Sequence, residues 1–202
     1  MTFTVRDACK LNEGALSIRI SDGIERIDQE TLDVAAGRSF FQQSHFTSGM
    51  QELVREGFKR LSGAAGGRPV FRLKQAMGGG KTHLLKVMSF LANHPELRGE
   101  FFPEATARYE FETAKVAFFH GREQPDDFFW GRIASQLGYE GIFEAGIKAP
   151  GENHWHTLFD KIKQPVLILL DEMPPYFASC HCSTGLKVTT RRNCQSFCWA
   201  CP

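Results

Sequence analysis

The chain has 202 residues, of which 42% are hydrophobic and 23% are charged, so it can form a globular core and is not a disordered chain. Its 24 Lys and Arg residues against 23 Asp and Glu residues give a formal net charge of +1, which argues against a strongly basic, nucleic-acid-coating surface. No apolar run approaches the ~20 residues that a membrane helix needs, and the N-terminus resembles no signal peptide. We therefore expect a cytoplasmic protein without membrane contact.

The N-terminal part gives weak signals, and we interpret residues 1–48 as an extension of a core that spans residues 49–177. Alternation over residues 16–20 predicts a short strand, and Asp22-Gly23 predicts a turn. Residues 49–61 carry apolar side chains at helical spacing, so they predict a helix with Ser48 or Thr47 as its N-cap.

Strand and helix patterns alternate regularly from residue 69 onward. Strands are predicted over residues 69–74, 115–119 and 166–170, and helices over residues 81–93, 126–137 and 154–162. The last strand is apolar without alternation, as in a central parallel strand that is buried on both faces. This order of elements predicts an α/β fold in which crossover helices connect the strands of a parallel sheet.

A glycine-rich motif lies between the first of these strands and the helix that follows. Residues 75–82 read QAMGGGKT, which is close to the phosphate-binding pattern GxxxxGK[ST] (Walker A), with Gln75 in place of its first glycine. In such a loop, backbone N–H groups and the helix N-terminus bind phosphate oxygens. The residues expected to bind the phosphates of ATP are Gly78, Gly79, Gly80, Lys81 and Thr82.

Two residues of this segment have further expected roles. The Thr82 hydroxyl is a candidate Mg²⁺ ligand, and the Lys81 ammonium would neutralise the β- and γ-phosphates. His83 is a candidate nucleotide contact, with a packed polar residue on the first helical turn as the alternative. Arg122, which follows the second strand, is either a phosphate sensor or a solvated arginine.

A second motif, the acidic pair Asp171-Glu172, ends the apolar strand, so residues 166–172 match a Walker B element. Ligands of open α/β sheets bind at the carboxyl ends of the strands, where this pair would meet the glycine loop. Asp171 is expected to hold Mg²⁺, and Glu172 to act as the general base toward the attacking water. The alternative interpretation of the pair is a solvated strand end. The second acidic residue, Glu172, argues against a small-molecule kinase.

These motifs resemble a family of prokaryotic AAA+-type ATPases catalogued as domain of unknown function 499. The resemblance rests on KQAMGGGKTHLL at residues 74–85 and LLDEMPPYF at residues 169–177, and it covers roughly residues 38–177. It implies a three-layer P-loop NTPase fold, ATP and Mg²⁺ as ligands, ATP hydrolysis and homo-oligomers. Members are often encoded beside DNA methyltransferase or phage-defence genes, so the resemblance also implies DNA-modification partners. A nucleotide-dependent regulatory switch and a non-functional N-terminal fragment are the alternatives to an active ATPase.

Residues 178–202 do not fit this pattern. They show no period and no β-rich run, although an ATPase of this class needs a further core strand after the acidic one. We therefore expect a sheet that is incomplete at its C-terminal end, and we interpret the segment as the result of a truncation or a shifted reading frame after about residue 177. The alternative is a zinc site built from Cys180, Cys182, Cys194, Cys198 and Cys201.

Overall fold

The computed structural model describes residues 33–74, 79–122, 128–143, 149–184 and 196–201, with side chains described up to residue 178. The strand and turn expected before residue 33 lie outside this part. Within the described residues, four strands form one sheet in the order β1-β4-β3-β2. Their bounds are β1 Val70–Leu73, β2 Lys115–His120, β3 Val166–Asp171 and β4 Ser196–Cys201.

The sheet is only partly parallel. β2 and β3 are parallel, with Lys115 opposite Val166 and His120 opposite Asp171, whereas β4 is antiparallel to both of its neighbours, β1 and β3. The α/β class is thus confirmed. The expected parallel sheet is present only in the pair of β2 and β3. The expectation of no strand after residue 177 is wrong, because β4 lies between β1 and β3. The shifted-frame interpretation itself stays a prediction.

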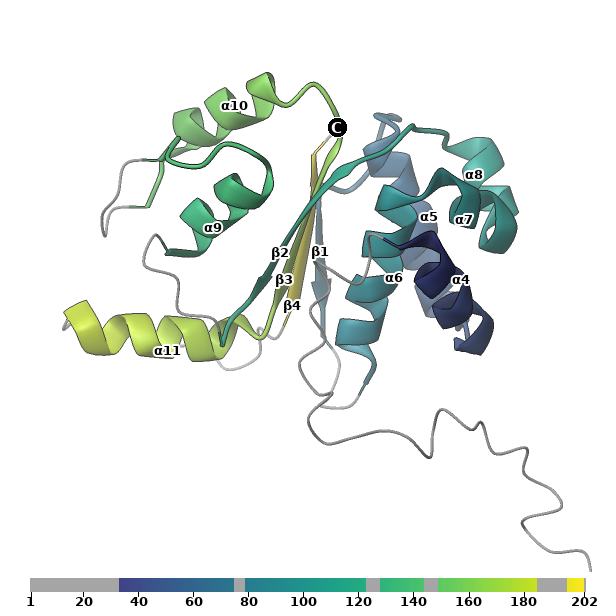
Figure 1. Ribbon diagram of the computed structural model, residues 1–202, viewed down its shortest axis with the longest axis horizontal. Helices are drawn as coiled ribbons and strands as arrows, with labels where there is room; N and C mark the ends of the chain where they lie inside the picture. The colour runs from purple at the N-terminus through teal and green to yellow at the C-terminus, as the bar shows by residue number, and fades with distance from the viewer. Residues whose placement is uncertain (1–32, 75–78, 123–127, 144–148, 185–195, 202) are drawn as a thin grey trace, which may run out of the picture.

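Helices cover both faces of the sheet (Figure 1). On one face lie α4 Val34–Gln43, α5 Ser48–Leu61, α6 Lys81–Asn93, α7 Pro95–Phe101 and α8 Pro103–Arg108. On the other lie α9 Phe128–Gln136 and α10 Glu152–Lys161, and α11 Met173–Thr184 leaves the end of β3 on the same side. Among the described residues, no helix combines the length and the hydropathy that crossing a membrane requires.

The buried strand β3 divides its side chains between two cores. Leu167 and Leu169 pack with the core under α4 to α7, while Ile168 and Leu170 pack with the core under α9 and α10. Successive residues of a strand point to opposite faces of a sheet, so a strand covered on both sides must be apolar at every position. The uninterrupted apolar run at residues 166–170 therefore indicated a strand that is buried on both faces.

A buried arginine ties α7 to the segment that leads into β2. The Arg98 side chain is 1% exposed, and its guanidinium donates hydrogen bonds to the carbonyl oxygens of Phe111 and Glu112 and lies 3.8 Å from the centroid of the Phe111 ring. Burial lowers the pKa of Arg98 to about 10. The guanidinium therefore remains charged at neutral pH, and its hydrogen bonds are charge-assisted.

Candidate functional site

The N-terminus of α6 lies at the edge of the sheet where β3 ends. Gly80 is the N-cap of α6, with φ +77° and ψ 20°, a left-handed conformation that glycine adopts without steric cost. The N-cap residue is a glycine, and it forms no side-chain cap hydrogen bond. Gly79 and Gly80 are exposed, Lys81 is half-buried as the first residue of α6, and Gly78 lies outside the described residues.

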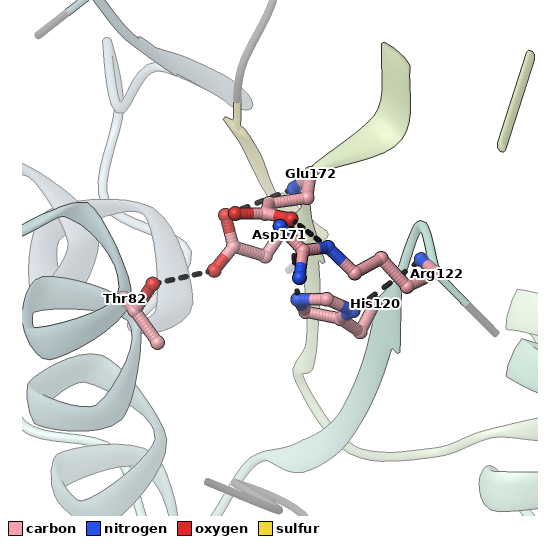
Figure 2. Close-up of polar contacts among 5 residues, drawn as sticks. All are labelled: Thr82, His120, Arg122, Asp171 and Glu172. Atoms are coloured by element: carbon pink, nitrogen blue, oxygen red, sulfur yellow. Dashed lines mark hydrogen bonds and ion pairs between the residues drawn. The ribbon is translucent and has the colours of Figure 1, made fainter. Parts of the chain in front are cut away.

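Thr82 and Asp171 join the helix start to the strand end, as Figure 2 shows. The Thr82 hydroxyl donates a hydrogen bond of 2.7 Å to Oδ2 of Asp171. The other carboxylate oxygen of Asp171 accepts from the Glu172 backbone N–H at 2.9 Å. The Asp171 residue is 1% exposed, so these bonds compensate for the burial of a carboxylate. The start of α6 and the acidic end of β3 therefore lie next to each other.

The Glu172 carboxylate contacts two side chains at the end of the neighbouring strand, β2. Nε of Arg122 lies 2.7 Å from Oε2 of Glu172, and Nε2 of His120 lies 3.8 Å from the same oxygen (Figure 2). The Glu172 backbone has φ +47°, a left-handed conformation that costs free energy for a residue with a side chain. The carboxylate thus stands beside Asp171 but points toward the end of β2.

Gly121 allows the two strand ends to approach each other. Its N–H donates a 2.8 Å hydrogen bond to the Asp171 carbonyl oxygen. A Cβ atom at this position would overlap the Glu172 carbonyl oxygen and would lie 2.9 Å from the Cα atom of Met173. Sequence reasoning did not select Gly121 or His120 as site residues. One signal was available in the sequence. Gly121 lies just after the second predicted strand, and the acidic pair Asp171-Glu172 lies at the end of the next predicted strand.

His83 lies on the side of α6 that faces α4. Its ring centroid is 4.6 Å from that of Phe40, with an angle of 39° between the ring planes. Two cavities, of about 480 Å³ beside α5 and α8 and about 560 Å³ between α9, α10 and β3, are lined by neither Thr82 nor Asp171. Among the described side chains, no three acidic, histidine or cysteine residues gather as a metal-binding group. The zinc hypothesis depends on cysteine side chains outside the described part.

The fold and the site define an α/β protein in which a strand–loop–helix unit meets an acidic strand end at one edge of the sheet. Over residues 29–100 the chain matches the family model described as the DUF499 N-terminal domain. The matched range includes Lys81, Thr82 and His83 and ends before Asp171 and Glu172. This match supports the family resemblance over that part of the chain. No curated protein and no solved structure matches the chain.

Proposed function

We propose that this chain binds ATP together with Mg²⁺ and hydrolyses it, as a P-loop NTPase of AAA+ type. The observation that carries the proposal is the hydrogen bond between Thr82 and Asp171, which lie 89 residues apart in the chain. The N-terminus of α6, which begins after the left-handed Gly80, supports a phosphate site, because the N–H groups and the dipole of a helix N-terminus favour an anion. Lys81 adds a positive charge at the same point.

Mg²⁺ fits the two oxygen atoms at the centre of this site. Mg²⁺ prefers hard oxygen ligands, and a threonine hydroxyl and a carboxylate both provide them. Oγ1 of Thr82 and Oδ2 of Asp171 are 2.7 Å apart, so these two residues would hold the ion. The ion would neutralise charge on the phosphates, and it would take further ligands from the nucleotide and water.

In the proposed reaction, a water oxygen attacks the terminal phosphorus of ATP. The bond from that phosphorus to the bridging oxygen breaks, ADP leaves with the bridging oxygen, and the water proton passes to the Glu172 carboxylate. The products are ADP and phosphate, and Glu172 then returns the proton to solvent. Positioning and charge neutralisation supply most of the acceleration in such reactions, which matches a site made of a lysine, two oxygen ligands and one base.

Replacement of Thr82 by alanine is expected to weaken Mg-ATP binding by about 10-fold, because loss of one hydrogen bond or metal ligand costs on the order of 1.4 kcal/mol. The loss should largely disappear when EDTA removes Mg²⁺. Titration calorimetry with ATP, with and without Mg²⁺, measures both quantities. A phosphate-release assay on the unchanged chain tests turnover directly.

The matched control is Thr157→Ala. Thr157 is an exposed threonine of α10 whose hydroxyl bonds the Asn153 carbonyl oxygen, so its loss should leave ATP affinity unchanged. Equal affinities of the unchanged chain and the Thr82→Ala variant in Mg²⁺ would remove Thr82 from the site. Absence of any ATP binding by the unchanged chain would overturn the proposed function.

A further inference from the structure

Strand β2 is the last strand in the order of the described sheet, so one of its edges pairs with β3 and the other faces away from the sheet. The Lys115 N–H, at the start of β2, donates to the Pro165 carbonyl oxygen on the side of β3. Backbone groups of successive strand residues alternate between the two edges, so those of Phe118 face the outer edge. Such an outer edge can pair with a strand from another chain.

The Gln136 side chain occupies the outer edge of β2. Its amide oxygen accepts a hydrogen bond of 2.7 Å from the Phe118 N–H, and its Nε2 donates one of 2.8 Å to the Phe118 carbonyl oxygen. A residue of an added antiparallel strand would make the same two bonds, because a hydrogen-bonded pair exchanges both N–H···O contacts. The primary amide of glutamine carries both a donor and an acceptor, so it takes the place of a strand residue.

The end of α9 holds the Gln136 amide against β2. Gln136 is the last residue of α9, which packs on β2, and the carbonyl oxygen of the next residue, Leu137, accepts a 2.9 Å bond from Nζ of Lys115. The Tyr139 hydroxyl donates at 2.8 Å to the carbonyl oxygen of Lys161, the last residue of α10. Contacts to β2 and to α10 therefore fix the chain that follows the glutamine.

The same edge of a second copy of this chain fits the outer edge of β2. Two identical edges can pair antiparallel about a two-fold axis, with Phe118 of one copy opposite Phe118 of the other. Residues 116–119 read VAFF, a run that is apolar, uncharged and free of proline and glycine. Runs of this composition pair readily when they lie on an open edge. An arriving copy would first have to displace the Gln136 amide.

We propose that the outer edge of β2 is a strand-pairing surface for a second copy of this chain, and that Gln136 keeps this surface closed. Without the amide, the N–H and carbonyl groups of Phe118 lose their partners, and pairing with a second copy satisfies both. Neither Gln136 nor Phe118 is among the residues proposed to bind ATP. The closure of the edge therefore does not depend on the proposed function.

The test replaces Gln136 by methionine, which has a similar length and helix propensity but no amide. At low protein concentration, the Phe118 amide hydrogen should exchange with solvent about 10-fold faster than in the unchanged chain, because it has lost its acceptor. At high concentration, sedimentation velocity should show twice the mass of the unchanged chain. The Phe118 amide should then become protected again, which identifies the β2 edge as the contact between the copies.

A second variant, Gln136→Glu, distinguishes this edge from any other contact surface. It keeps an acceptor for the Phe118 N–H but removes the donor to the carbonyl oxygen and places a negative charge on the edge. Charged side chains on an edge strand oppose pairing, and like charges that meet across the two-fold axis repel each other. Gln136→Glu should therefore not associate at concentrations at which Gln136→Met does. Equal association of both variants would place the contact elsewhere and would overturn the proposal.

The matched control is Gln43→Met. Gln43 is the last residue of α4, as Gln136 is of α9, but it is exposed and its Nε2 donates to the Ser39 hydroxyl at 3.3 Å. This variant should keep the mass and the Phe118 exchange rate of the unchanged chain. If Gln136→Met also keeps both, the proposal is wrong. The unchanged chain gives a further check that needs no variant, since exchange of its Phe118 amide at the rate of an unstructured peptide would show that Gln136 does not close the edge.

Discussion

Lys81→Ala is expected to weaken Mg-ATP binding by at least about 100-fold, because an ammonium bonded to two phosphate groups contributes on the order of 1.5–3 kcal/mol per charged hydrogen bond. Lys81 is the first residue of α6 and directly follows the left-handed Gly80, so its backbone position is fixed by the helix start. The helix N–H groups remain in the variant, which leaves a weak residual phosphate site. Titration calorimetry with Mg-ATP measures the change.

Two controls separate this effect from general damage. Lys163→Ala removes an exposed lysine in the segment before β3, with the same change in net charge, and should leave the affinity unchanged. Urea unfolding of Lys81→Ala should remain a single cooperative transition, since alanine is favourable in a helix and the fold is retained. If Lys81→Ala binds Mg-ATP as tightly as the Lys163→Ala control, the phosphate-loop assignment is wrong.

Gly121→Ala is expected to destabilise the fold by about 3 kcal/mol or more, toward the upper end of the cost of overpacking. The added Cβ would overlap the Glu172 carbonyl oxygen and would lie 2.5 Å from the Glu172 carbonyl carbon. Both are backbone atoms, so no side chain can rotate away, and the ends of β2 and β3 must separate. That separation also breaks the Gly121–Asp171 hydrogen bond and moves Glu172.

Urea denaturation followed by tryptophan fluorescence measures the loss of stability. The matched control is Gly99→Ala, because a Cβ on Gly99 of α7 meets no atom within 4 Å. Alanine is favoured over glycine inside a helix, so Gly99→Ala should stabilise the protein by up to about 1 kcal/mol. Similar unfolding midpoints for the two variants would contradict the close approach of the two strand ends.

The elements with strong local signals were predicted well. The helix predicted over residues 81–93 is α6, because a glycine turn marks its start and apolar residues fill its inner side. The helix predicted over residues 49–61 is α5, and Thr47 is its N-cap, with its hydroxyl oxygen accepting from the Met50 N–H at 3.3 Å. The residues that define these boundaries lie close to them in the sequence, so the boundaries can be predicted from the sequence alone.

Of the missed helices, α4 depends on contacts that a single sequence does not reveal. α4 contains Gly37, which weakens a helix, yet a Cβ there would lie 2.6 Å from Cδ1 of Leu97 and 2.8 Å from Cδ1 of Phe90. The glycine therefore allows α4 to pack closely on α6 and α7, a tertiary reason for its presence. α7 and α8 start at Pro95 and Pro103, and proline at the first helical position was a usable signal that was not applied.

The candidate site was predictable as two motifs but not as a set of contacts. The convergence of Thr82 and Asp171 followed from the rule that ligands bind where parallel strands end. The pairing of Arg122 with Glu172 required the register of β2 on β3 and the left-handed backbone at Glu172, neither of which is visible in residue patterns. The roles of these residues in ATP chemistry stay predictions.

The insertion of β4 between β1 and β3 imposes an order of assembly. β2 and β3 pair with each other and can form one hydrogen-bonded unit, whereas the described sheet joins β1 only to β4, with Val70 opposite Trp199. Contacts between residues far apart in the chain form slowly, because a long loop must close first. We therefore expect the acidic end of β3 to be in place early and β1, the strand that precedes the glycine-rich segment, to dock late. A partly folded chain would then carry Asp171 and Glu172 beside β2 before Thr82 reaches them.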